Sequence, residues 1–388
     1  MFIAMIILII SLALIFFAMV GYPILLIILD KIMQPKPIKK NYKFTPTVSF
    51  MIVAHNEEKV LYNKLINAIS LDYPKEKFEI VVASDNSTDK TNSIVNLFIE
   101  KNPNYKIRLY CTKDHKGKTN AQNEAQKTIL SEILVMTDAN TILKQNAIRE
   151  LVACFTSQEI VYVCGKLVYS NAEDAVTSNS EATYWNIDMK MRDIESRIQT
   201  ITAGNGAIYA CRNKEYIDFE LIKCHDSAMP FQYGISGKRA LFNPEAIAVE
   251  KAGETNEDEF KRKVRMNRII LSTLKDSVKT INFFRLKWFS FFYFGHRTCR
   301  YSLWIFHAAV FVCSIVMACM GNMFGMIMTL MQLFGIIISL CQLKKSLNNK
   351  CMRLVGYYGM TVLAQYIGVY RTITRKAKPV WEKADSTR

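Results

Sequence analysis

The sequence predicts an α/β domain carried between hydrophobic helices, with transmembrane segments on its N- and C-terminal sides. Three observations point to this fold class. Residues 2–29 are apolar and uncharged throughout, which exceeds the roughly 20 residues that a helix needs to span a bilayer. Between residues 47 and 197, short β-rich runs alternate with helix-like stretches, a pattern typical of a sheet covered by helices. Long apolar segments return after residue 300.

The first apolar run is predicted to be a membrane anchor of residues 1–30. A cleaved signal peptide is disfavoured because no basic residues precede the run and no small-residue cleavage site follows it. Residues 31–46 are basic and contain prolines. They are therefore predicted to form a linker that marks the cytoplasmic end of the anchor.

Residues 47–277 are predicted to form one cytoplasmic domain. Its β-rich runs end in polar residues and lie at 47–54, 78–84, 105–111, 132–138 and 160–169. The stretches with helical character lie at 57–70, 89–101, 118–130 and 181–197. Strands that alternate with helices favour a parallel sheet, which binds ligands at the C-terminal ends of its strands.

The C-terminal part is predicted to return to the membrane. Residues 278–297 mix Trp, Tyr and Phe with Arg and Lys, a composition that suits an amphipathic helix at the membrane interface. Residues 298–371 carry apolar segments at 301–320 and 323–342, and a shorter one at 354–370. Whether the third segment crosses the membrane stays open, because a full crossing would place the basic tail outside, against the positive-inside tendency.

The charge distribution supports a membrane protein over a nucleic-acid-binding one. The formal net charge is +16, but residues 1–260 carry about −2 and the remainder about +18. Basic residues that flank membrane helices on the cytoplasmic side account for this excess better than a nucleic-acid site does. Residues 372–388 are accordingly predicted to be a basic cytoplasmic tail.

The ten cysteines contain no CxxC or CxxxC spacing and lie in apolar surroundings. This scatter predicts reduced cysteines in a cytosol-facing protein, and neither disulfides nor a zinc site.

Polar clusters follow the strands and predict a binding site. They are AHNEE (54–58), SDNSTD (84–89), DHKGKTNAQN (114–123) and TDAN (137–140). One such cluster alone is typical of turns and helix caps. Four clusters at one edge of a sheet favour a nucleotide diphosphate site, with carboxylates for a base or a divalent cation and a lysine for phosphate.

These motifs, in this order and spacing, resemble the inverting family-2 glycosyltransferases with a GT-A fold. The resemblance covers about residues 45–270, and the flanking apolar segments, GHR (295–297) and VWEK (380–383) are similar to the membrane-anchored bacterial branch. It implies a GT-A (Rossmann-like) mixed sheet flanked by helices. It also implies Mg²⁺ or Mn²⁺ as cofactor, held at Asp138 and Asn140 in the place of the family's DxD motif.

The resemblance further implies a role for each matching residue. Asp226 corresponds to the general base, within a segment that usually begins with two acidic residues. Asp85 would contact the base of the nucleotide, and Lys118 would border the diphosphate pocket. The full set of implied nucleotide-sugar-binding residues is Ala54, Glu57, Asp85, Lys118, Asp138, Gly204, Asn205, Lys263 and Arg265.

Two departures from the family pattern bear on these roles. His225 stands where the first of the two acids is usual, which leaves the base in place and changes its neighbour. Residues 262–266 match the QxxRW motif of processive members only by Arg265. That mismatch weighs against an enzyme that extends a polymer through its own pore.

The expected function is transfer of a sugar from a nucleotide-sugar, expected to be a UDP-sugar, to a lipid-linked or polysaccharide acceptor in cell-envelope glycan synthesis. The expected location is the inner membrane, as a multi-pass protein whose catalytic domain faces the cytoplasm. Membrane lipids and proteins of a polysaccharide assembly system are the expected partners, and nucleic acid is not. Two alternatives stay open: a processive polysaccharide synthase, and a catalytically silent scaffold that binds nucleotide-sugar.

Overall fold

The computed structural model describes residues 1–170, 176–251, 253, 255–344, 347 and 349–380. The chain divides into two compact units. Residues 34–172, 185–252 and 378–388 belong to the unit that contains the sheet, called here the sheet unit. Residues 1–33, 173–184 and 253–377 belong to the helical unit. The end of the predicted tail, from residue 381, lies outside the described residues, as does most of VWEK.

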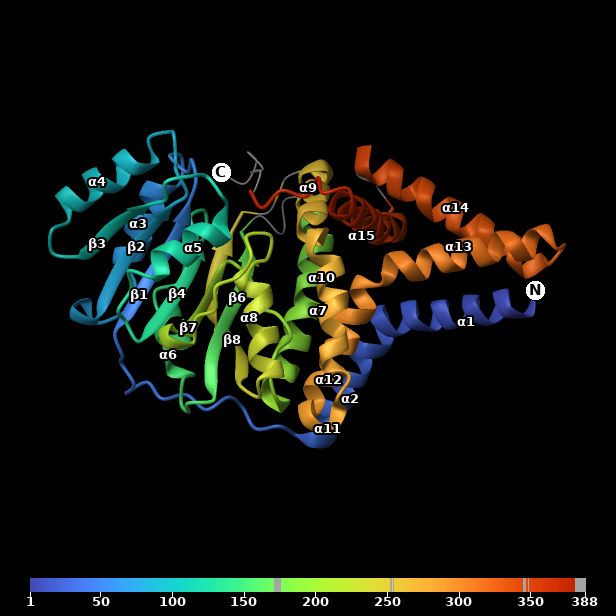
Figure 1. The fold of residues 1–388 in the computed structure, drawn as a ribbon, viewed down its shortest axis with the longest axis horizontal. Coiled ribbons are helices and arrows are strands. Elements are labelled where there is room, and N and C mark those ends of the chain that lie inside the picture. Colours follow the sequence, from blue (N-terminus) through green and yellow to red (C-terminus); the bar gives the residue numbers. More distant parts are fainter. Residues whose placement is uncertain (171–175, 252, 254, 345–346, 348, 381–388) are drawn as a thin grey trace. The chain divides into compact units, whose positions relative to one another are not determined.

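The sheet unit is built on an eight-stranded mixed sheet in the order β3-β2-β1-β4-β7-β6-β8-β5 (Figure 1). Its strands are β1 Val48–Ala54, β2 Phe78–Ser84, β3 Lys106–Cys111, β4 Ile133–Asp138, β5 Ile142–Leu143, β6 Ile160–Tyr169, β7 Ile208–Arg212 and β8 Arg239–Glu250. The first four strands of the order are parallel, while β7 is antiparallel to both β4 and β6. The expected parallel sheet is therefore correct for the N-terminal half only, and the mixed sheet is confirmed.

Helices cover both faces of this sheet. They are α3 Leu61–Ile69, α4 Thr91–Lys101, α5 Lys118–Gln126, α6 Ala147–Ala153, α7 Val176–Ile198 and α8 His225–Ile235. Phe50 and Ile52 of β1 share a buried cluster with residues of α3, α4 and α6. Met51 and Val53 of the same strand share another with residues of α5, α7 and α8. Because successive strand residues point to opposite faces, a strand with helices on both sides is apolar throughout.

The helical unit contains the long apolar helices. Its elements are α1 Phe2–Phe16, α2 Tyr22–Met33, α9 Asn256–Met266, α10 Ile270–Ser277, α11 Phe283–Leu286, α12 Trp288–Tyr293, α13 Leu303–Cys319, α14 Met323–Lys344 and α15 Lys350–Ile373. Leu8 of α1 packs against Val310, Cys313 and Met317 of α13. Gly295 lies so close to the ring of Tyr22 that an added Cβ would come within 2.1 Å of it.

Among the described residues, two helical stretches are long and apolar enough to cross a membrane: Met323–Lys344, and Phe2–Met33, in which the π-helical residues Phe17–Gly21 join α1 to α2. The pair Trp288–Cys299 and Leu303–Cys319 would add a third span if it is counted as one helix, although it bends by 56°. Residues 278–297, expected to form one amphipathic helix, form several short helical pieces. The segment 354–370 is helical within α15, and the question of whether it crosses a membrane stays open.

Candidate functional site

The parallel strands bring the predicted polar residues to one edge of the sheet. In the register of the sheet, Ala54 lies beside Ser84, and Val53 lies beside Asp138. Asp138 ends β4, and Asp85 follows directly after β2. The three strand ends therefore meet at the edge where ligands bind in α/β folds.

Three charged side chains converge at this edge around Gly206. A Cβ added to Gly206 would lie 3.0 Å from Lys118 Nζ, 3.4 Å from Asp138 Oδ2 and 3.8 Å from Asp226 Oδ2. Lys118 begins α5, and its amine forms an ion pair with Asp138. Asp226 lies in the first turn of α8. Because glycine has no side chain, the point that all three charged groups face stays open at Gly206.

The charges of this cluster change the proton affinity of its members. Burial alone lowers the pKa of Lys118, but the carboxylates of Asp138 and Asp226 outweigh it and raise that pKa overall. Burial raises the pKa of Asp226. The positive charge of Lys118 lowers this pKa, and the negative charge of Asp138 raises it. A carboxyl group with a raised pKa is a better proton acceptor than a free aspartate, as a general base requires.

Asp138 and Asn140 offer oxygen ligands that suit a hard divalent cation. Asn140 Nδ2 donates a hydrogen bond to Glu250 Oε1 at 2.9 Å, and this bond involves the amide nitrogen and not the amide oxygen of Asn140. Carboxylate and amide oxygens are the ligands that Mg²⁺ and Mn²⁺ prefer. This donor set fits the predicted cation, and the amine of Lys118 pairs with the carboxylate of Asp138. Glu250 was not predicted, because no spacing in the sequence links the end of β8 to Asn140.

Asp85 is buried and holds the loop that precedes α5. Its carboxylate accepts hydrogen bonds from Lys116 N at 3.2 Å, Gly117 N at 2.7 Å and Thr112 Oγ1 at 3.3 Å. His115 Nδ1 lies 2.7 Å from the same carboxylate. The predicted contact of Asp85 with a nucleotide base stays a prediction, while the structure gives this residue a clear part in ordering residues 112–117.

Two histidines stack beside Asp85. The rings of His55 and His115 lie 3.6 Å apart at an interplanar angle of 10°. These residues and Asp85 place potential ligand atoms within 4.8 Å of one another. Parallel stacked imidazoles cannot both direct an in-plane lone pair at one ion lying between them. This geometry does not favour the histidine pair as a cation site, and the predicted cation at Asp138 stays a prediction.

The loop before β7 connects the strand edge that carries Asp138 to the second half of the sheet. Gly204 N donates to the backbone oxygen of Asp226 at 2.8 Å. A Cβ on Gly204 would lie 2.1 Å from the hydroxyl of Tyr162. Asn205 Nδ2 donates to Gly165 O at 2.6 Å. Both predicted loop residues thus fix the backbone around Gly206 and Asp226.

The remaining predicted residues lie in different places. Ala54 is buried and its carbonyl accepts from Asp85 N at 2.9 Å. Glu57 is buried, and its backbone N–H donates to Thr91 Oγ1 at 2.7 Å. Lys263 and Arg265 belong to α9 in the helical unit. Their predicted contact with the diphosphate therefore stays a prediction.

His225, the departure from the usual acid, is a buried neutral side chain. Its Nδ1 lies 2.9 Å from Gln122 Oε1, and its Nε2 lies 2.8 Å from the hydroxyl of Tyr216. Burial lowers the pKa of His225 to about 3, and Lys118 acts in the same direction. The imidazole is therefore uncharged at neutral pH and ties the start of α8 to α5.

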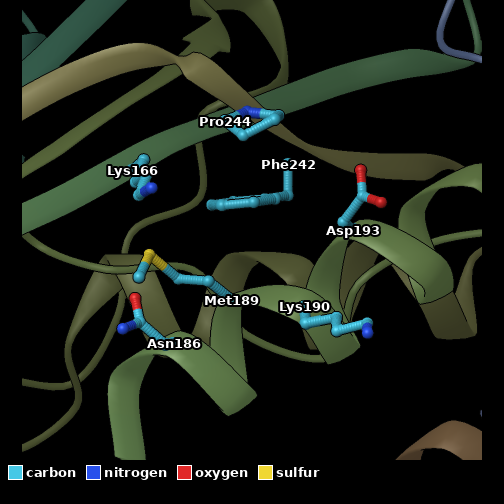
Figure 2. Close-up of a pocket in the computed structure, with 7 residues that line it drawn as sticks. All are labelled: Lys166, Asn186, Met189, Lys190, Asp193, Phe242 and Pro244. Atoms are coloured by element: carbon cyan, nitrogen blue, oxygen red, sulfur yellow. The ribbon is translucent and has the colours of Figure 1, made fainter. Parts of the chain in front are cut away.

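A separate cavity of about 290 Å³ lies between α7 and strands β6 and β8 (Figure 2). Its lining residues are Lys166, Asn186, Met189, Lys190, Asp193, Phe242 and Pro244. In Figure 2 the ring of Phe242 stands between Lys166 and Asp193, above the face of α7 that carries Met189. None of the predicted site residues lines this cavity.

Sequence comparisons match part of the chain to a known family. Residues 49–218 match the profile described as "Glycosyl transferase family 2". A probable glycosyltransferase of Bacillus subtilis is 36% identical over 138 residues, which are 34% of this chain and 32% of that protein. A beta-monoglucosyldiacylglycerol synthase of a Nostoc species is 25% identical over 37% of this chain and 31% of its own length. The chain thus spans about a third of these two relatives.

Two further matches extend over more of the chain. A poly-beta-1,6-N-acetyl-D-glucosamine synthase of Staphylococcus epidermidis is 23% identical over 63% of this chain and 60% of that protein. Among solved structures, a mannosyltransferase of Pyrobaculum calidifontis in complex with GDP-Man and Mn²⁺ superposes with a TM-score of 0.73. It is 19% identical and covers 95% of this chain and 99% of its own. The predicted GT-A fold is confirmed by this likeness, and residues 49–218 match a glycosyltransferase domain of family 2.

Proposed function

We propose that this protein transfers a sugar from a nucleotide-sugar donor, a UDP-sugar in the first instance, to a lipid-linked or glycan acceptor, with inversion at the anomeric carbon. The observation that carries the proposal is the convergence of Lys118, Asp138 and Asp226 around Gly206. One amine and two carboxylates at a strand edge provide a cation for phosphate, a ligand for a metal and a base for a hydroxyl group.

Each of the three side chains has a distinct task in this proposal. Oδ2 of Asp226 accepts the proton of the acceptor's hydroxyl group. At the same time, the oxygen of that hydroxyl group attacks the anomeric carbon from the face opposite the leaving diphosphate. Lys118 turns from Asp138 to the phosphate oxygens, where its charge stabilises the departing group. A bound Mg²⁺ or Mn²⁺ would supply Lewis-acid stabilisation of that diphosphate from Asp138 and Asn140.

The membrane setting rests on the apolar helices and on the charge pattern. The helices Phe2–Met33 and Met323–Lys344 are long enough to cross a bilayer, and the basic excess follows residue 260. We propose a multi-pass protein of the inner membrane with residues 47–277 as a cytoplasmic catalytic domain. Donor would then come from the cytoplasm and acceptor from the lipid surface.

The relatives suggest two classes of acceptor. One relative is named for a glucosyl diacylglycerol and another for a polymer of N-acetylglucosamine. The longer alignment belongs to the polymer synthase, which supports processive synthesis as the second candidate. Against it stands the weak match to QxxRW, since residues 262–266 retain only Arg265.

The deciding experiment measures nucleoside diphosphate release by the purified full-length protein. A panel of UDP- and GDP-sugars is supplied with Mn²⁺ or Mg²⁺, with and without a polyprenyl-linked acceptor or diacylglycerol. One donor is expected to give metal-dependent release that rises with one acceptor, and the length of the product separates single transfer from polymer synthesis.

The matched control is Asp226→Asn, which keeps the shape of the side chain and removes its basicity. Turnover is expected to fall by roughly 10²–10⁴, while donor binding, measured by displacement of a labelled nucleotide, persists. Near wild-type turnover in Asp226→Asn would disprove the assignment of the base. Nucleotide binding without release for any donor and acceptor would favour the silent scaffold.

A further inference from the structure

Lys64 is a fully buried lysine on the inner face of α3. Its neighbours on that face, Leu61, Leu65 and Ala68, are apolar and buried as well. An apolar side chain would suit this position, because burying an amine costs free energy unless its hydrogen bonds are made. A lysine at this position therefore indicates that the amine at the end of its side chain forms specific hydrogen bonds.

The amine of Lys64 bonds to both sides of the turn that carries the predicted metal ligands. Nζ donates to Thr141 O at 2.5 Å and to Thr137 Oγ1 at 3.1 Å. It also lies 5.2 Å from the ring centroid of Phe50. Within the described part of the chain, Lys64 makes no ion pair with a carboxylate.

Thr137 and Thr141 bracket Asp138 and Asn140. Thr141 N lies 3.4 Å from Asp138 O across the turn. Thr137 Oγ1 also donates to Ala207 O at 2.7 Å, next to Gly206. Through Thr137, the amine of Lys64 is thus linked to two segments. One is the 137–141 turn, which carries the predicted metal ligands, and the other is the loop that contains Gly206.

Lys64 and Lys118 reach this turn from different helices with different effects. Lys118 pairs with the carboxylate of Asp138 itself, whereas Lys64 bonds a backbone carbonyl and a hydroxyl group. Burial lowers the pKa of Lys64 to about 7, although the carboxylates of Asp138 and Glu250 act in the opposite direction and raise it. A neutral amine still has two N–H groups, so both contacts hold in either protonation state.

We propose that Lys64 is a positioning residue, which fixes the 137–141 turn so that Asp138 and Asn140 present their oxygens at the spacing that a divalent cation needs. The inference rests on the proposed function, because it takes the cation to bind at this turn. Groups that orient metal ligands without touching the metal typically change metal affinity by roughly 10–100-fold.

The test measures Mn²⁺ binding directly, with no donor present, by electron paramagnetic resonance of the free ion. Lys64→Met keeps the apolar length of the side chain and removes the amine, and we expect Mn²⁺ affinity to fall by roughly 10–100-fold. Thr137→Val removes the hydroxyl that Lys64 bonds and serves as the deciding variant if Lys64→Met does not fold. Thermal unfolding of the metal-free proteins reports folding separately.

Lys77 provides a matched control at the other end of the sheet. Its Nζ donates to Thr45 O at 2.8 Å and to Thr45 Oγ1 at 3.3 Å. Lys77→Met therefore loses bonds of the same kind, but near the start of β1, whereas Asp138 lies beside the end of that strand. Lys77→Met is expected to bind Mn²⁺ as the wild type does. Equal losses in Lys64→Met and Lys77→Met would show a general effect on stability and overturn the proposal.

Asp138→Ala separates failure of this inference from failure of the proposed function. If Asp138→Ala loses Mn²⁺ binding and Lys64→Met retains wild-type affinity, Lys64 has no positioning role. If Asp138→Ala itself binds Mn²⁺ as the wild type does, the cation lies elsewhere and the proposed site is wrong.

Discussion

The amine of Lys118 and the carboxylate of Asp138 form an ion pair at the point where the proposed cation binds. Both side chains are only partly covered, with 23% and 34% of their surfaces exposed. In the absence of metal, the lysine neutralises a carboxylate that also faces Asp226. A divalent cation that binds Asp138, as proposed, would therefore compete with this lysine.

This competition predicts opposite effects of Lys118→Met on metal binding and on turnover. Without the amine, Mn²⁺ affinity is expected to rise by roughly fivefold, because a partly exposed ion pair is worth about 1 kcal/mol. Turnover is expected to fall, because the phosphate oxygens lose their cation. Calorimetric Mn²⁺ titration and initial rates measure the two effects, and parallel losses in both would refute the competition.

Asp138 and Asn140 are predicted to contribute unequally. Asp138→Ala removes the charged ligand and is expected to reduce turnover by roughly 10²-fold or more, as the loss of about 3 kcal/mol of charge stabilisation implies. Asn140→Ala removes a neutral oxygen and the bond to Glu250, so a much smaller loss is expected. Initial rates at several Mn²⁺ concentrations test the pair, and equal losses would show that the ligand assignment is wrong.

Gly206 is predicted to be required for the space that it leaves. In Gly206→Ala, the methyl group would lie 3.0 Å from Lys118 Nζ, so the amine must shift by a few tenths of an ångström. A displacement of that size at a catalytic group is expected to cost roughly tenfold in turnover. Gly335→Ala in α14 is the control, because an added Cβ there meets no atom within 4 Å. A fully active, folded Gly206→Ala would contradict the described convergence.

The strand edge could be predicted from sequence because its elements are regular. The runs that became β1, β2 and β4 are short and mostly apolar, and polar residues of the site lie at or directly after their ends. β7 was missed because its five buried residues follow closely on the glycine-containing loop 203–207. β8 was missed because Asn243, Pro244 and Glu245 interrupt it, where its register with β6 shifts between Gly165 and Lys166. Proline in a strand usually marks such an irregularity.

The partners of buried polar groups could not be predicted, because they depend on contacts between distant segments. In the sequence, Lys64 looks like an ordinary helical lysine. Only the structure shows that its amine bonds to Thr141, which lies 77 residues further along the chain. Asp85 has the residue type of a base-contacting group, yet the hydrogen-bond partners of its carboxylate come from residues 112–117. Residue type thus indicated where chemistry occurs, and three-dimensional contacts indicate how it is held in place.

The last prediction concerns pH. Asp226 must be deprotonated to accept a proton, so kcat/KM is expected to fall on the acid side as pH drops through its pKa. Burial raises this pKa above the ordinary aspartate value, and Asp138 raises it further, while Lys118 and Arg192 lower it. The acid limb is therefore expected at higher pH than for an exposed aspartate. Lys118→Met removes one of the lowering charges, so the limb of its residual activity is expected to move to still higher pH. The profiles are measured at saturating Mn²⁺ for both proteins, and a limb that stays fixed or moves to lower pH in Lys118→Met would exclude Asp226 as the titrating base.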